Sequence, residues 1–189
     1  FSLMKSLENT TYLHPHYFSD EQAEQIFSPI HTDEFEENGR LGNTNVVVLI
    51  LESFSKEYIG FYNQHIDGYT GYTPFLDSLL AHSVTYSHSF ASGRKSIDAM
   101  PSVLSSIPML IEPYVVTPYS TNAVSSLAAC LRDEGYTTAF FHGAPNGSMG
   151  FQAYARSAGF EQYFGMDEYN GIEAFDGTWA IWDEEFLQY

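Results

Sequence analysis

One run of apolar residues stands out in the hydrophobic pattern of the chain. Residues 46–51 are six consecutive Val, Leu and Ile residues, and a turn-like segment of Gly, Asn and Thr precedes them. Such a run predicts a strand over 45–54 that is buried on both faces of a parallel sheet. In open α/β sheets ligands collect at the carboxyl ends of strands, so Glu52, which ends the run, is a candidate functional residue. Alternatively, Glu52 is only the first exposed residue after a core strand.

Helical and strand patterns alternate through the rest of the chain. Thr73 followed by Pro74 is typical of a helix start, and alternating polar and apolar residues over 83–90 are typical of a strand. Further helices are predicted from about Ser96 to 104, over 121–134, over 153–158 and from 178 onward, and further strands over 136–142 and 160–164. This alternation predicts one α/β domain over residues 41–189 with a mostly parallel sheet.

Residues 1–40 do not follow this pattern. They are polar and acidic, and they hold no long strand-like run. Ser19 or Asp20 is a suitable N-cap for a short helix that reaches about residue 27. We expect this part to be a lead-in segment that wraps the domain.

The composition narrows the possible partners. The 24 Asp and Glu residues outnumber 7 Lys and Arg, which gives a formal net charge of -17 at pH 7. This charge repels the phosphate backbone of nucleic acids, so no nucleic-acid partner is expected. Cys130 is the single cysteine and lies in an apolar helical segment. We expect its side chain to be buried filler of the core, packed among apolar residues, and not a nucleophile. No apolar run reaches the roughly 20 residues that cross a bilayer.

A hydroxyl group is predicted at a helix start beside two cations. Gly93, Arg94 and Lys95 lead directly into Ser96. Backbone N–H groups and the positive end of the helix dipole favour an anionic ligand and an ionised nucleophile there. A carboxylate such as Glu52 can hold a divalent cation, which lowers the pKa of a nearby hydroxyl and prepares it to attack phosphorus or sulfur. The alternative is that Ser96 caps the helix and that both cations are solvated.

His142 ends the strand predicted over 136–142. A polar side chain at the end of a neighbouring strand can reach a ligand there, so His142 is a candidate substrate contact. The alternative is a structural histidine that is hydrogen-bonded at a strand end.

Several of these segments together resemble the extracytoplasmic domain of lipoteichoic acid synthase-type enzymes, which belong to the alkaline phosphatase and sulfatase superfamily. The likeness covers roughly residues 41–189 and rests on the run over 45–54, the Thr-Pro-Phe-Leu helix start at 73–76, the segment 89–98, Phe-His-Gly at 141–143 and Gly-Phe at 159–160. It implies a three-layer α/β/α sheet of the alkaline phosphatase type. Glu52 would be a metal ligand, and Ser96 would form the covalent intermediate and contact the same metal. That metal would be manganese, zinc or magnesium.

The chain also departs from the family pattern at three places. It stops at Tyr189, before the Asp-His pair that completes the metal site in the family, so we expect this piece to lack a complete site and activity of its own. Residues 147–152 read Gly-Ser-Met-Gly-Phe-Gln where lipoteichoic acid synthases carry Phe-Trp-Asn-Arg, which argues against polyglycerolphosphate synthesis. Residues 96–100 do not fit the Cys/Ser-x-Pro-x-Arg signature of type I sulfatases, which favours phospho-group transfer over sulfate-ester hydrolysis.

We therefore expect part of a metal-dependent phosphotransferase or phosphodiesterase that acts on a membrane lipid or cell-surface glycan. Ser96 is the expected nucleophile, and Arg94, Lys95 and His142 are the expected substrate contacts. The resemblance implies an extracytoplasmic location, periplasmic or on the outer face of the cell membrane, and anchoring by segments outside this chain. The alternatives are a sulfatase-like hydrolase of the same superfamily and a non-catalytic domain whose many aromatic residues bind a glycan or a partner protein.

Overall fold

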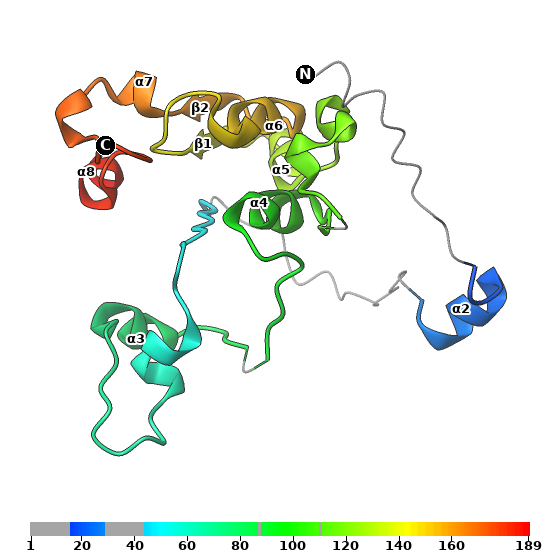
Figure 1. Cartoon of the computed structure of the whole chain (residues 1–189), viewed down its shortest axis with the longest axis horizontal. Coiled ribbons are helices and arrows are strands. Elements are labelled where there is room, and N and C mark those ends of the chain that lie inside the picture. Colours follow the sequence, from blue (N-terminus) through cyan, green and yellow to red (C-terminus); the bar gives the residue numbers. More distant parts are fainter. Residues whose placement is uncertain (1–15, 29–43, 87, 110) are drawn as a thin grey trace. The chain divides into compact units, whose positions relative to one another are not determined.

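The structure is a computed structural model that describes residues 16–28, 44–86, 88–109 and 111–189. The chain divides into two compact units, Phe1–Val48 and Leu49–Tyr189. The α-helices are α2 (Asp20–Ile26), α3 (Pro74–Leu80), α4 (Ser96–Ser105), α5 (Leu127–Asp133), α6 (Phe151–Ser157), α7 (Met166–Tyr169) and α8 (Asp183–Gln188), and the strands are β1 (Ala139–Phe141) and β2 (Gln162–Phe164) (Figure 1). The 3-10 helices are η1 (Lys56–Tyr58), η2 (Gly60–Tyr62), η3 (Tyr114–Val116), η4 (Pro118–Thr121), η5 (Ser148–Gly150) and η6 (Ile172–Ala174).

The predicted helix of the first unit is confirmed as α2. The Ser19 side chain accepts a hydrogen bond from the backbone N–H of Gln22 at 3.3 Å, and the Gln22 side chain accepts one from the Ser19 N–H at 3.0 Å. This reciprocal pair satisfies two backbone donors that the helix itself leaves free.

Strands β1 and β2 pair in parallel, with Phe140 opposite Tyr163. The connection between them carries α6, which gives the β-α-β order expected of an α/β protein. Thr138 and Glu161 directly precede the two strands and hold their first residues together. The Glu161 carboxylate accepts the Thr138 N–H at 2.9 Å, and the Thr138 hydroxyl accepts the Glu161 N–H at 3.1 Å. The predicted strands over 136–142 and 160–164 are therefore confirmed in shortened form.

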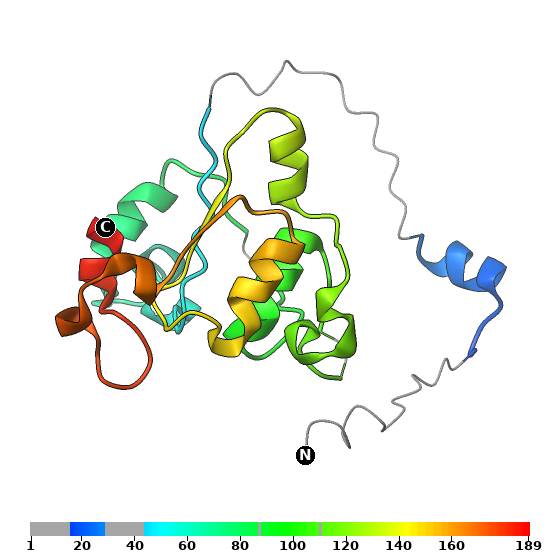
Figure 2. The same cartoon turned by 90° about the horizontal axis from the view of Figure 1, so that it is seen from above.

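The main hydrophobic core lies between α4 and α6, which run close together in Figure 2. Its buried members are Met100, Leu104, Val115, Phe151, Tyr154 and Ala158. Phe140 of β1 packs against this cluster, so one face of the sheet contributes to the same core. Pro101 is fully buried inside α4 although proline lacks the N–H of a helix interior. Packing thus fixes the helix that begins at Ser96.

Two predicted strands are wrong. Residues 45–51 have no regular secondary structure, and their apolar side chains are exposed, Val47 by 77% and Leu49 by 67%. Residues 83–86 and 88–90 are also irregular and largely exposed, and residue 87 lies outside the described residues. A strand needs hydrogen-bonding partners at its edges, and in the part of the chain that the structure describes β1 and β2 pair only with each other. The apolar pattern gives the tendency to form a strand but not the partner.

Two predicted helices begin later than expected. The Ser126 hydroxyl accepts the Ala129 N–H at 3.0 Å and donates to the Ala158 carbonyl, so α5 starts at Leu127 and not at 121. Before α8, the Asp176 carboxylate accepts three backbone N–H groups, those of residues 178, 179 and 180, which hold that segment as a turn. In both places a short polar side chain bonds the local backbone and sets the boundary.

Two further expectations concern Cys130 and the membrane. Cys130 is exposed on α5, so its predicted role as buried filler is wrong. It occupies the outer face of that helix, whereas Ala128 occupies the buried one. Over the described ranges no helix is both long and apolar enough to span a bilayer.

Candidate active site

Ser96 is the first residue of α4. Lys95 before it has an extended backbone, with φ -132° and ψ 153°, so the helix starts abruptly at the serine. The Ser96 side chain is half-buried. Free backbone N–H groups and the dipole of this ten-residue helix favour negative charge at its start. The predicted helix start is confirmed, whereas the role of Ser96 as nucleophile stays a prediction.

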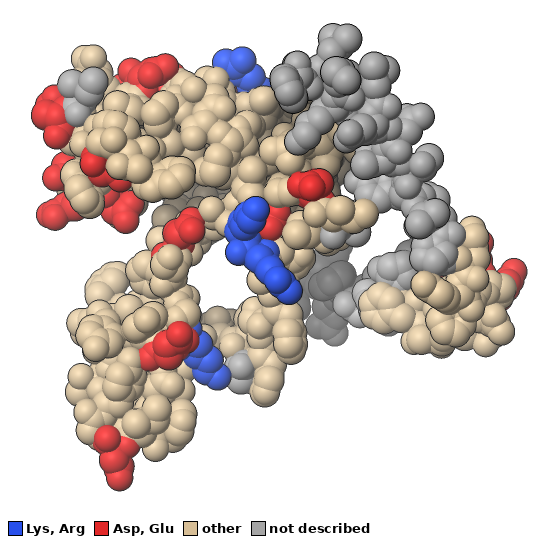
Figure 3. All heavy atoms as spheres, viewed as in Figure 1, with Lys and Arg blue, Asp and Glu red and all other residues tan. Residues whose placement is uncertain are grey.

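Arg94 and Lys95 are both exposed, directly before Ser96. They are two of only seven Lys and Arg residues in the chain. Acidic side chains gather instead over α7 and α8, where residues 167, 168 and 183–185 are exposed carboxylates (Figure 3). An anionic substrate is repelled by such a surface and attracted by the two cations. Their contact with a substrate stays a prediction.

Asp98 organises the loop that leads to Ser96. Its Oδ2 accepts the backbone N–H groups of Arg94 and Lys95, both at 3.2 Å. Its side chain is only 3% exposed, and no hydrogen bond reaches its Oδ1 within the described residues. Sequence reasoning missed Asp98, although a carboxylate three residues after the N-cap is a known partner for the N-cap N–H. That spacing was the available signal.

Glu52 lies in a turn, exposed to solvent, before Ser53, whose φ of 60° is in the left-handed region. No hydrogen bond joins Glu52 to Ser96 in the described part of the chain. Their oxygen donors suit manganese or magnesium, which favour oxygen ligands, and zinc also accepts carboxylate oxygen. Two donors do not complete a site, and among the residues that the structure describes no three His, Cys, Asp or Glu side chains are grouped closely enough to hold a metal. The metal role of Glu52 and Ser96 stays a prediction.

His142 follows β1 directly and extends its pairing, since its backbone N–H donates to the Phe164 carbonyl at 2.9 Å. The imidazole meets the ring of Phe151 edge-on, with 4.4 Å between ring centroids. Its buried Nδ1 has no partner among the described residues. Burial lowers the pKa of His142 from 6.5 to about 4, so the ring is neutral at pH 7. A neutral imidazole can offer one hydrogen bond to a substrate but no positive charge.

The pKa of His142 predicts a pH effect on stability. The unfolded chain binds this proton below about pH 6.5 and the folded chain only below about pH 4, so stability falls as the pH drops through this window. Allowing for partial exposure, we expect a loss on the order of 2 kcal/mol. The free energy of unfolding in urea is measured at pH 7 and pH 4.5 for the wild type and for His142→Gln. The contribution of His142 is the loss between the two pH values in the wild type minus the loss in His142→Gln. The exposed His65→Gln should keep the wild-type loss; an equal loss in His142→Gln would contradict the assignment.

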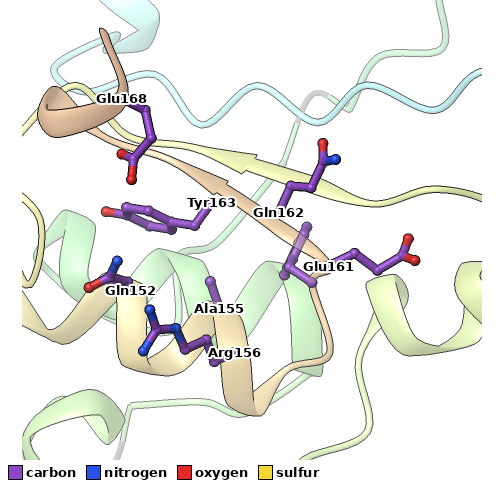
Figure 4. Close-up of a pocket in the computed structure, with 8 residues that line it drawn as sticks. Gln152, Ala155, Arg156, Glu161, Gln162, Tyr163 and Glu168 are labelled. Atoms are coloured by element: carbon purple, nitrogen blue, oxygen red, sulfur yellow. The ribbon is translucent and has the colours of Figure 1, made fainter. Parts of the chain in front are cut away.

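A pocket of about 170 Å³ lies between α6, β2 and α7 (Figure 4). It is lined by Gln152, Ala155, Arg156, Phe160, Glu161, Gln162, Tyr163 and Glu168. The pKa of Tyr163 is raised to about 12, mainly by burial and then by the charges of Glu168 and Asp167. The phenol therefore stays neutral and is a poor nucleophile at pH 7. No predicted site residue lines this pocket, so we do not place the chemistry there.

Comparison with known proteins gave one family match and two similar structures. The sequence profile of the family described as Sulfatase matches residues 44–189. The lipoteichoic acid synthase LtaP from Listeria monocytogenes is 20% identical, with a TM-score of 0.56, and the similarity covers 63% of this chain. A protein in the alkaline phosphatase superfamily from Vibrio parahaemolyticus is 23% identical, with a TM-score of 0.56, and the similarity covers 68% of this chain. No curated protein matches the chain.

The matched region spans only 29% and 31% of the lengths of these two solved chains. At such identities the likeness establishes the fold alone. It confirms the expected fold class, an α/β fold of the alkaline phosphatase type.

Proposed function

Because the chain belongs to the Sulfatase family, we propose that the whole protein is a metal-dependent phosphotransferase or phosphodiesterase with Ser96 as its nucleophile. The proposed substrate is a membrane lipid or a cell-surface glycan, and the proposed location is extracytoplasmic. The structural similarity to LtaP, which by its name is a synthase of lipoteichoic acid, supports this choice.

One observation carries the proposal. A half-buried serine begins a ten-residue helix whose core face is packed, and two exposed cations directly precede it. A nucleophile needs a fixed position and an environment that favours its ionised form. The helix start supplies both, and Arg94 and Lys95 add attraction for an anionic group.

In the proposed reaction the Ser96 hydroxyl loses its proton and its oxygen bonds to phosphorus of a phosphodiester. The P–O bond to the substrate alcohol breaks, and the alcohol leaves with one proton, which balances the proton lost by Ser96. The resulting phosphoserine is resolved by water or by a sugar or glycerol hydroxyl, which regenerates the serine. Glu52 and Ser96 would help to hold a manganese, zinc or magnesium ion, which would lower the pKa of the serine hydroxyl. Arg94 and Lys95 offset the charge of the phosphate, and neutral His142 donates or accepts one hydrogen bond.

A sulfate ester is the competing substrate, because the family is named for sulfatases. The segment after Ser96 argues against it, since Asp98 and Met100 stand where the signature with which type I sulfatases modify their nucleophile has Pro and Arg. A phosphate diester and a sulfate monoester each carry one negative charge, so a direct assay of both esters is needed to distinguish them.

The test is an assay of the full-length protein on bis-nitrophenyl phosphate and nitrophenyl sulfate, after chelation and after addition of manganese, zinc or magnesium. We expect turnover of the phosphate diester that chelation abolishes and one of these metals restores. Glu52→Gln should raise the metal concentration for half-maximal activity at least about tenfold, because a charged ligand is lost. Exposed Glu57→Gln is the matched control and should not. Faster turnover of the sulfate would favour a sulfatase, and absence of both turnover and metal affinity would favour a binding domain.

A further inference from the structure

Asp98 is a buried carboxylate whose position needs an explanation beyond helix capping. Its side chain is 3% exposed, and ionised carboxylates are rarely so deeply buried. A serine or aspartate at the N-cap would bond the helix start without burying a charge. The N-cap here is Lys95, whose side chain cannot accept a hydrogen bond. The acceptor is supplied instead from inside the helix.

The Asp98 carboxylate holds two consecutive residues of the loop. Its Oδ2 accepts the N–H groups of Arg94 and Lys95, both at 3.2 Å. In return, the Asp98 N–H donates to the Lys95 carbonyl at 3.0 Å. The backbone immediately before Ser96 is therefore tied to α4 at three hydrogen bonds.

Gly93 lets the loop approach this carboxylate. A Cβ atom built on Gly93 would lie 2.3 Å from the Asp98 Cβ and 2.5 Å from its Oδ2. Contacts under 3.0 Å require the chain to shift, and the carboxylate of a buried, short side chain has little room to do so. Only glycine fits against Asp98 with the loop in this position.

Ser102 holds the same loop one turn further along α4. Its Oγ lies 2.6 Å from the Ser92 Oγ and 2.8 Å from the Asp98 carbonyl oxygen. The loop is thus attached to α4 on both sides of Gly93, at Ser92 and at residues 94 and 95. Ser96 follows Lys95 directly, so the hydrogen bonds from the Arg94 and Lys95 N–H groups to Asp98 hold the backbone from which the Ser96 side chain projects.

We propose that Asp98 is a positioning residue for Ser96, with Gly93 as its necessary neighbour. The inference rests on the proposed function, because it assumes that Ser96 attacks the substrate. Asp98 acts through geometry: its oxygen accepts the two loop N–H groups and holds the Ser96 hydroxyl in the direction of attack. Misplacing a reacting group by about 1 Å can cost about a hundredfold in rate.

The experiment compares Asp98→Asn, Asp98→Glu and Gly93→Ala in the full-length protein. Asparagine keeps an oxygen acceptor at the same distance without the charge, whereas glutamate keeps the charge and moves the oxygen by one methylene. For Asp98→Asn we expect kcat within about tenfold of wild type. For Asp98→Glu and Gly93→Ala we expect kcat lower by about a hundredfold, with KM changed by less than about threefold. Asp98→Glu combined with Gly93→Ala should be no slower than either alone, because both release the same loop.

Two results would overturn the inference. One is the reverse order, with Asp98→Glu active and Asp98→Asn inactive, which would mean that Asp98 acts through its charge and not through the position of its oxygen. The other is wild-type kcat in all three variants with only a lowered melting temperature, which would leave Asp98 a purely structural role. Ser96→Ala distinguishes failure of this inference from failure of the proposed function. If Ser96→Ala keeps full activity, Ser96 is not the nucleophile, whatever the Asp98 variants do.

Discussion

Ser96→Ala should lower kcat of the full-length protein by at least about a thousandfold. The substitution deletes the oxygen that forms the covalent intermediate, and loss of a nucleophile removes the whole double-displacement route. Ser96 is the first residue of α4 and not its N-cap, and the N–H groups of the loop before it bond Asp98. The free energy of unfolding should therefore change by less than about 1 kcal/mol. The measurements are steady-state kinetics on a phosphate diester and urea unfolding of the same samples.

Two matched variants separate the nucleophile from its neighbours. Ser96→Thr keeps a hydroxyl at the same position and should retain measurable turnover. Ser92→Ala deletes a hydroxyl from the same loop that lies 2.6 Å from the Ser102 Oγ. This substitution should lower the free energy of unfolding by about 1 kcal/mol and kcat by only a few fold. If Ser92→Ala were inactive and Ser96→Ala active, the nucleophile would be assigned to the wrong residue.

The parts of the fold that sequence predicted are those that local chemistry decides. Ser19 bonds the first turn of α2, and Thr73 followed by Pro74 precedes α3, so both helix starts agree with the pattern. The loop with Gly93 that leads into Ser96 is likewise a local feature, and α4 begins where this loop predicts. Capping and fixed proline φ act within four residues, which a sequence window contains completely.

The parts that sequence did not predict depend on distant partners. The run 46–51 has the composition of a buried strand, but its exposed side chains have no neighbouring strand in the described part of the chain. The spacing of Asp98 from Lys95 predicts a bond to the N-cap N–H, but its burial and the close approach of Gly93 depend on the tertiary fold and are not predicted by spacing. A metal shared by Glu52 and Ser96 would likewise join residues that are far apart in sequence, which a local pattern does not predict.

Tyr154→Ala should cause the largest loss of stability, about 3 to 5 kcal/mol, because Tyr154 is 1% exposed at the centre of the core that supports α4. Its ring meets Tyr114 edge-on, with 6.3 Å between centroids, and its hydroxyl lies 2.6 Å from the Ser105 Oγ on α4. Alanine removes both contacts and leaves a cavity beside the helix that begins at Ser96. Urea unfolding followed by circular dichroism measures the loss.

Two controls divide this loss between packing and hydrogen bonding. Tyr154→Phe keeps the ring and removes only the hydroxyl, so it should cost about 1 kcal/mol, and combining it with Ser105→Ala should cost less than the sum of the two single changes. Phe75→Ala removes a ring of similar size from a position on α3 that is 81% exposed, and it should cost less than about 0.5 kcal/mol. A loss below about 1 kcal/mol for Tyr154→Ala would mean that the contact between α4 and α6 does not carry the stability of the helix that presents Ser96.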